Sequence, residues 1–161
     1  MILLIVATPC YSKVFLMEMI IAVDFDGTIV EDKYPLIGKE KPFAIDTLKL
    51  LQQERYRLIL WTVRQGEQLD EAVKWCKDRG VEFYAVNKDY PEEEKENNAS
   101  YSRKIKADIF IDDRNLGGLP DWGTIYRIIK EGKTLRTIIK ETISSSIADT
   151  QPPKRKHWWQ F

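Results

Sequence analysis

The chain has 161 residues with 25 basic and 25 acidic side chains, so its formal net charge is zero and no overall charge favours binding to nucleic acid. This length fits one domain with a sizeable core. Two cysteines are too few for a disulfide framework, and the single histidine, His157, lies near the C-terminus, which excludes a Ser-His-Asp triad and a histidine-rich zinc site within the domain. We therefore expect a reduced, cytoplasmic protein in which carboxylates or lysines perform any acid–base chemistry.

The N-terminal segment, Met1 to Leu16, is mostly apolar. It lacks the basic start of a signal peptide and is too short to span a bilayer. We expect residues 1–18 to be an extension outside the main domain, with an additional edge strand as the alternative reading.

An apolar run, Ile20 to Val23, leads directly into two aspartates, Asp24 and Asp26, and then into Gly27. A short apolar run that ends in turn residues is typical of a strand buried on both faces in a parallel sheet. Open α/β sheets bind their ligands at the carboxyl ends of such strands. Two carboxylates this close repel each other, and a hard cation with oxygen ligands is the simplest compensation.

The next stretch, residues 31–42, is polar and too short for a folded domain. Apolar residues at helical spacing then predict a helix from Phe43 to about Glu54, followed by a strand over Leu58–Val63. Thr62 near the end of this strand is either a hydroxyl donor to phosphate or an ordinary strand residue. Arg64 is either a phosphate ligand or a solvated loop charge.

A helix over Gln65–Arg79 and a strand over Val81–Val86 come next, followed by a polar stretch, residues 87–102, which we expect to be a mobile loop with a short helix near its end. The predicted strand Asp108–Ile111 then ends in a second acidic pair, Asp112 and Asp113. One aspartate after a strand is usually a cap or turn residue, but two acidic pairs at strand ends favour a site. If the two strands are parallel neighbours, four carboxylates meet at one edge of the sheet.

Two helices are predicted beyond this point, over residues 122–130 and 134–147. The second lies in a C-terminal region, residues 132–150, that either packs on the domain or forms a dimer contact. Residues 151–161 are a basic, aromatic tail, which we expect to be disordered.

Four segments resemble, in the right order, the motifs of the haloacid dehalogenase (HAD) superfamily of phosphohydrolases. The first motif is the most specific, and the resemblance covers about residues 20–129. The matching segments are DFDGT at Asp24–Thr28, LILWT at Leu58–Thr62, a third-motif lysine at Lys104 or alternatively Lys88, and IDD at Ile111–Asp113.

The resemblance implies a small HAD-like catalytic domain over residues 19–131. Its fold would be a three-layer α/β/α sandwich with a mainly parallel, Rossmann-like sheet. It would have no cap domain, and the polar stretch after the first motif would form a small flap over the site.

The resemblance also implies the role of each site residue. Asp24 would be the nucleophile and Asp26 the acid–base. Mg²⁺ would be held by Asp24, the backbone carbonyl of Asp26 and Asp112, with Asp113 binding it directly or through another ligand. Charge on the phosphoryl oxygens would be neutralised by Thr62 and Lys104. Arg64 is a further candidate for substrate binding because of its place after the strand end, and the resemblance does not assign it.

We therefore expect a Mg²⁺-dependent phosphatase of a phosphomonoester, either a small molecule or the phosphorylated end of a polymer, with no membrane partner. An open site suits a large substrate or one partly covered by a second copy of the chain in a homo-oligomer. Two alternatives stay open: a non-catalytic phosphoacceptor or binding module like a response-regulator receiver, and a metal-dependent nuclease that uses the same carboxylates.

Overall fold

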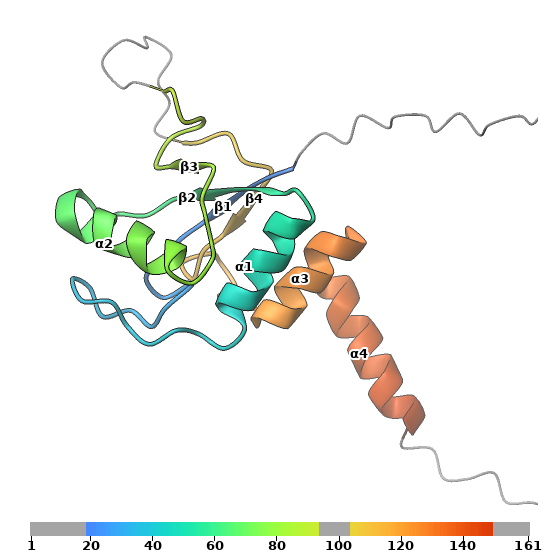
Figure 1. Cartoon of the computed structure of the whole chain (residues 1–161). Coiled ribbons are helices and arrows are strands. Elements are labelled where there is room, and N and C mark those ends of the chain that lie inside the picture. Colours follow the sequence, from blue (N-terminus) through green and yellow to red (C-terminus); the bar gives the residue numbers. More distant parts are fainter. Residues whose placement is uncertain (1–18, 94–103, 150–161) are drawn as a thin grey trace, which may run out of the picture.

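The computed structural model describes residues 19–93 and 104–149, which form an α/β domain around a four-stranded sheet (Figure 1). The sheet has the order β3-β2-β1-β4 and all its neighbouring strands are parallel, as the sequence predicted. The elements in chain order are β1 (Ile20–Val23), α1 (Ala44–Gln53), β2 (Arg57–Leu60), α2 (Gly66–Lys77), β3 (Ala85–Val86), β4 (Ile109–Ile111), α3 (Trp122–Glu131) and α4 (Leu135–Asp149).

Three predictions fall outside the described residues: the N-terminal extension, the short helix before Lys104, and the basic tail, residues 151–161.

The strand β1 lies at the centre of the sheet because it is apolar on both faces. Its Ile21, Ala22 and Val23 are all at most 1% exposed. It pairs with β2 on one side and with β4 on the other, and Val23 lies opposite both Leu60 and Ile111. The residues that follow β1 and β4 therefore begin at the same edge of the sheet.

The two faces of the sheet are covered differently. One face carries the larger core, in which alternate strand residues such as Ile21 and Leu58 pack with apolar residues of α1, α2 and α3. The other face carries a smaller cluster of Ala22, Ile59 and Ala85 with Ile105. Within residues 19–93 and 104–149 no helix covers this second face, so the expected third layer is not found there.

Three predicted strands are shorter in the structure than in the sequence analysis, and β4 differs by only one residue. The third strand contains only Ala85 and Val86, because these are the residues that pair with the neighbouring β2. The strand β2 ends at Leu60, so Trp61, Thr62 and Val63 belong to the loop that follows and are able to line a pocket.

The polar stretch after the first motif forms a flap that returns to the sheet. The Glu31 amide donates to the Lys39 carbonyl, and the Lys41 amide donates to the Ile29 carbonyl. The segment between these two contacts, residues 32–38, is called the flap below. No folded domain is inserted here, as the sequence analysis expected.

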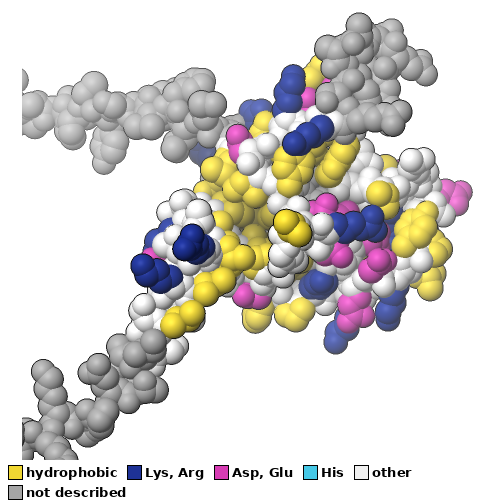
Figure 2. All heavy atoms as spheres, turned by 180° about the vertical axis from the view of Figure 1, so that it is seen from behind, with side chains coloured by type: hydrophobic (Ala, Val, Ile, Leu, Met, Phe, Trp, Pro, Cys, Tyr) yellow, Lys and Arg dark blue, Asp and Glu magenta, His cyan; other side chains and the backbone are white. Residues whose placement is uncertain are grey.

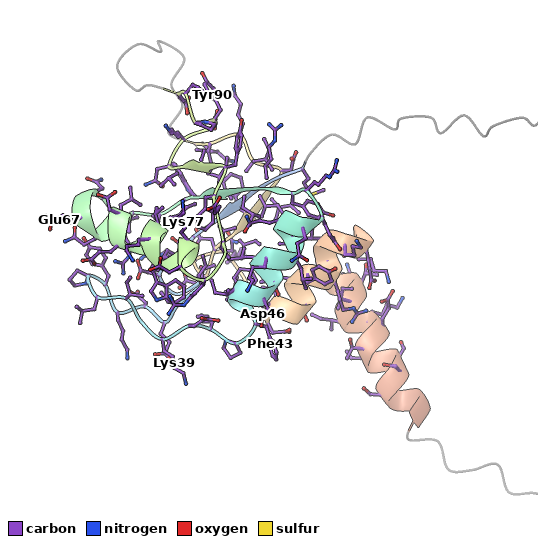
Figure 3. All side chains as sticks on the ribbon, viewed as in Figure 1. Lys39, Phe43, Asp46, Glu67, Lys77 and Tyr90 are labelled. Atoms are coloured by element: carbon purple, nitrogen blue, oxygen red, sulfur yellow. The ribbon has the colours of Figure 1, made fainter. Side chains whose placement is uncertain are left out.

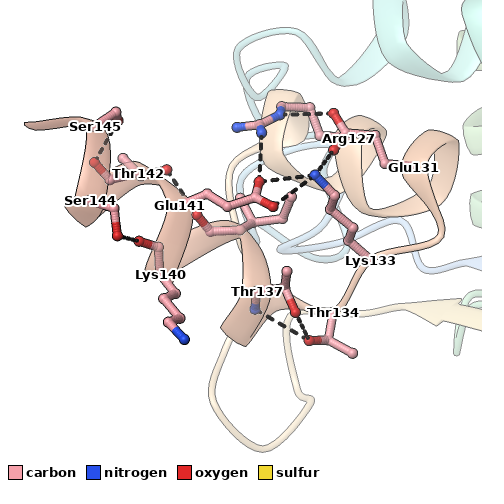
Figure 4. Close-up of polar contacts among 11 residues, drawn as sticks. Arg127, Glu131, Lys133, Thr134, Thr137, Lys140, Glu141, Thr142, Ser144 and Ser145 are labelled. Carbon is pink, nitrogen blue, oxygen red and sulfur yellow. Dashed lines mark hydrogen bonds and ion pairs between the residues drawn. The ribbon is translucent and has the colours of Figure 1, made fainter.

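Helix α4 extends away from the domain and contacts mainly α3 (Figure 1). Lys133 forms ion pairs with Glu131 and Glu141, and Arg127 reaches the same two carboxylates (Figure 4). Figure 2 shows a row of hydrophobic side chains along this helix. In the described part of the chain, no helix has the length and apolar character that crossing a bilayer requires.

Candidate active site

Asp24, Asp112 and Asp113 meet at the carboxyl edge of the sheet, as the sequence analysis expected. Asp24 follows β1, and its amide donates to the carbonyl of Ile111, the last residue of β4, at 2.9 Å. Asp112 and Asp113 follow directly. One carboxylate oxygen from each of the three aspartates lies within 4.8 Å of the others.

The turn after β1 brings its backbone close to Asp113. The Phe25 carbonyl accepts hydrogen bonds from the amides of Thr28, Ile29 and Val30, which closes the turn. Gly27 has a φ of +79°, and a Cβ atom at this position would lie 2.2 Å from Asp113 Oδ2. Only glycine combines this backbone conformation with this approach.

Thr28 is a site residue to which the sequence analysis gave no role, although it stands in the first motif. Its hydroxyl lies 3.4 Å from Asp24 Oδ2 and accepts a hydrogen bond from the Asp113 amide at 3.0 Å. Its carbonyl accepts from the Trp122 indole at 3.2 Å, and its side chain is fully buried. Thr28 therefore links the two acidic strand ends and α3.

The surroundings of Asp24 favour its neutral form. Burial raises its pKa from the ordinary 3.8 to about 7, and the carboxylates of Asp112, Asp113 and Asp26 add to this effect, while the hydrogen bond from the Phe25 amide opposes it. A bound cation would reverse this balance because it stabilises the ionised carboxylate.

The donor set suits a hard divalent cation. All three side chains offer carboxylate oxygens, which Mg²⁺ and Ca²⁺ prefer. The Oδ1 atom of Asp113 is buried and has no hydrogen-bond partner among the described residues. Buried charged oxygens are rarely left unpaired, so this atom fits the position of a ligand to a cation.

Asp26, the fourth expected carboxylate, takes part in a different interaction. Its two oxygens accept hydrogen bonds from Arg64 Nε and Nη2 at 2.6 and 2.7 Å. The Arg64 side chain is fully buried. Arg64 was expected to bind phosphate as a pocket residue, or else to be a solvated loop charge. The structure instead pairs it with Asp26, and it is not among the residues that line the pocket.

A cavity of about 150 Å³ opens beside the acidic cluster. Thr62 lines it, and the Thr62 amide donates a hydrogen bond to Asn87 Oδ1 at 2.8 Å. The complete lining is Asp24, Asp26, Trp61, Thr62, Val63, Asp112 and Arg114.

Neither of the two lysines considered for the third motif lines this cavity. Lys104 is exposed, and its Nζ lies 5.9 Å from the centre of the Phe110 ring. Lys88 Nζ donates to the Pro91 carbonyl. Among the described residues that line the cavity, Arg114 alone is positively charged. Its amide donates to Asp112 Oδ1 at 2.8 Å, which fixes its backbone beside the acidic cluster.

No family model matches the chain, and no curated protein matches it either. The solved structure of a conserved protein from Bacteroides thetaiotaomicron is 68% identical in sequence to the chain. The match covers 74% of this chain and 96% of that protein, with a TM-score of 0.70. This identity over nearly the whole of the Bacteroides protein means that the chain belongs to the same family as that conserved protein.

Proposed function

We propose that this protein is a Mg²⁺-dependent, HAD-like phosphatase that hydrolyses a phosphomonoester through an aspartyl-phosphate on Asp24. The observation that carries the proposal is the meeting of Asp24 with Asp112 and Asp113 at one sheet edge beside an open cavity. The order of the four motif-like segments in the sequence supports it further.

Asp24, Asp112 and Asp113 would hold the cation, whose positive charge would offset that of the carboxylates and of the phosphoryl group. The buried, unpartnered Oδ1 of Asp113 supports this assignment. Thr28 keeps the two acidic segments in register because its hydroxyl contacts both of them.

In the first step a carboxylate oxygen of Asp24 attacks phosphorus, the new O–P bond forms, and the bond to the leaving oxygen breaks. Asp26 gives the leaving oxygen a proton. In the second step water attacks phosphorus, Asp26 takes a proton from it, and inorganic phosphate leaves as the Asp24 carboxylate is restored. Both steps depend mainly on positioning and charge, which is typical of phosphoryl transfer.

Thr62 and Arg114 are the groups on the cavity wall that can bind the phosphoryl oxygens. The Thr62 hydroxyl can donate one hydrogen bond, and a guanidinium can donate two in parallel. Arg114 thus supplies the positive charge that the resemblance assigned to Lys104.

The test is the release of phosphate from p-nitrophenyl phosphate by the full-length protein in millimolar MgCl₂. Asp24→Asn should abolish release, because the amide is a much weaker nucleophile, and the variant should keep its circular dichroism spectrum. Asp46→Asn is the matched control, since Asp46 lies on the outer surface of α1 (Figure 3) and should leave the rate unchanged.

The same preparation distinguishes the alternative functions. A stable phosphoprotein that forms from acetyl phosphate without turnover would indicate a phosphoacceptor module. Cleavage of bis-p-nitrophenyl phosphate in preference to the monoester would indicate a nuclease. Either result would overturn the proposal, as would retained activity in Asp24→Asn.

A further inference from the structure

Arg64 connects its own loop to two segments that are distant from it in sequence. It lies in the loop between β2 and α2, its guanidinium pairs with Asp26 in the turn after β1, and it also reaches the flap. Arg64 Nη1 donates to the Pro35 carbonyl at 3.0 Å, and Nη2 donates to the Leu36 carbonyl at 2.8 Å. Every one of these partners is an oxygen, and two of them belong to the flap backbone.

Two aromatic rings also contact the Arg64 guanidinium. The Arg64 Cζ atom lies 5.0 Å from the centre of the Phe25 ring and 5.4 Å from the centre of the Tyr34 ring. Phe25 belongs to the turn after β1 and is fully buried, whereas Tyr34 belongs to the flap and is 55% exposed. Guanidinium groups bind aromatic faces within about 6 Å. The two rings therefore connect the same pair of segments that the hydrogen bonds connect.

Because the Arg64 side chain is buried, its hydrogen-bond partners cannot be replaced by water. A buried arginine is stable only when carboxylate and carbonyl oxygens satisfy its donors, because removing it from water is costly. The hydrogen bond to Asp26 raises the pKa of Arg64, so the group stays charged. Lysine carries the same charge but cannot present two parallel donors to Asp26 while also reaching both flap carbonyls.

We infer that Arg64 is a positioning residue that fixes the Asp26 carboxylate and flap residues 34–36 as one unit. Asp26 lines the cavity, so its orientation decides whether it can exchange a proton with the leaving oxygen or with water. The position of the flap and the orientation of Asp26 are then linked through one guanidinium. The catalytic half of this inference rests on the proposed phosphatase function, whereas the flap half does not.

The first test compares Arg64→Lys with wild type in two measurements. For p-nitrophenyl phosphate in MgCl₂, kcat should fall by about 10- to 100-fold while KM changes by less than about threefold, because Asp26 is misoriented but the groups expected to bind phosphate are untouched. Trypsin should cleave faster after Lys33 and Lys39, which flank the contacts of the flap with Arg64. Arg127→Lys on α3 is the matched control and should change neither measurement.

A second variant covers the case in which Arg64→Lys does not fold. Tyr34→Ala removes the exposed flap ring from the guanidinium without leaving a buried charge unpaired. It should also speed cleavage of the flap and lower kcat, by about three- to tenfold. Tyr90→Ala removes another exposed tyrosine, far from the flap in Figure 3, and should have no such effect.

A role limited to stability predicts a different result. In that case folded Arg64→Lys and Tyr34→Ala would have a lower melting temperature but an unchanged kcat, and this outcome overturns the inference. If wild type itself releases no phosphate from any monoester, the proposed function fails. Trypsin cleavage then still decides the flap half, and equal cleavage of wild type and both variants would overturn it.

Discussion

Arg114 illustrates how the chemistry of the cavity depends on single residues. It follows the acidic pair directly, and its backbone is anchored to Asp112. Lys104 lies in the loop before β4, where its ammonium is near the Phe110 ring. Under the proposed function, a phosphoryl group that reaches Asp24 would enter the cavity on whose wall Arg114 lies.

Substitution of Arg114 and of Lys104 can therefore show which of the two side chains binds the phosphoryl group. Arg114→Ala should raise KM for p-nitrophenyl phosphate by about tenfold, because a charge-assisted pair of hydrogen bonds to phosphate is lost. Lys104→Ala should raise KM by less than about twofold. Steady-state kinetics of both variants in the same buffer checks this. A larger effect for Lys104→Ala would return the phosphate-binding role to that lysine.

The three clustered aspartates were predictable from sequence, whereas the environment of Arg64 was not. Apolar runs that end in acidic pairs identify strand ends, and the parallel order of the strands brings Asp24 and Asp112 together. The burial of Arg64 depends on contacts with Asp26 and the flap, which are far from it in sequence. An arginine is usually exposed, so no local pattern indicated that this one is buried.

At the scale of elements, α3 is held to the domain by both ends. Its first residue, Trp122, donates to the Thr28 carbonyl beside the acidic cluster. Further along the helix, Tyr126 near its middle and Lys130 near its end both donate to Glu54 Oε1, just after α1. A displacement of the first residues of α3 should therefore move Trp122 and, through its hydrogen bond, Thr28 in the site.

The start of α3 offers a direct test. The Asp121 carboxylate accepts from the Thr124 amide at 2.9 Å and from the Thr124 hydroxyl at 2.7 Å, which lowers the pKa of Asp121. Asp121→Ala should lower the free energy of unfolding by about 1 kcal/mol, since the helix loses its N-cap. Asp121→Asn should lose less than half of that. Urea unfolding of the three proteins measures both values, and equal stability of Asp121→Ala and wild type would contradict the prediction.

The helices were easier to predict than the layers. Spacing of apolar residues located the four helices of the described residues to within a few residues. This spacing reflects a buried face in α1, α2 and α3, whereas among the described side chains of α4 only Ile138 is buried. The prediction of a third layer required instead that the connection between β3 and β4 place a helix on the second face of the sheet. That stretch is polar in sequence, and the smaller cluster on this face of the sheet contains Ile105 and no residue of a helix in the described part of the chain.

At the scale of the whole molecule, the acidic cluster connects folding to metal and to pH. The folded protein brings Asp24 close to Asp112 and Asp113, whereas the unfolded chain separates them and returns the pKa of Asp24 to its ordinary value. Folding without a cation therefore carries an electrostatic cost when all three are ionised. A divalent cation that binds only the folded state would remove this cost and add its own binding free energy.

The direction of the pH dependence follows from Asp24. Its pKa is about 7 when folded and near 3.8 when unfolded, so between these values the folded state holds a proton that the unfolded state lacks. Stability in EDTA should therefore fall as pH rises from 5 to 8, by about 1–3 kcal/mol after allowance for solvent screening. Glu54 and Asp121, whose pKa values are lowered, give their full stabilisation above about pH 5 and do not mask the effect.

Urea unfolding at pH 5 and pH 8, in EDTA and in millimolar MgCl₂, measures this coupling. Mg²⁺ should stabilise the protein more at pH 8 than at pH 5, because the cation competes with the proton on Asp24. Asp24→Asn should be more stable than wild type at pH 8 in EDTA and should show little of the pH difference, since its amide neither titrates nor repels. Wild-type stability in EDTA that rises between pH 5 and pH 8 would mean that Asp24 is already ionised in the folded protein.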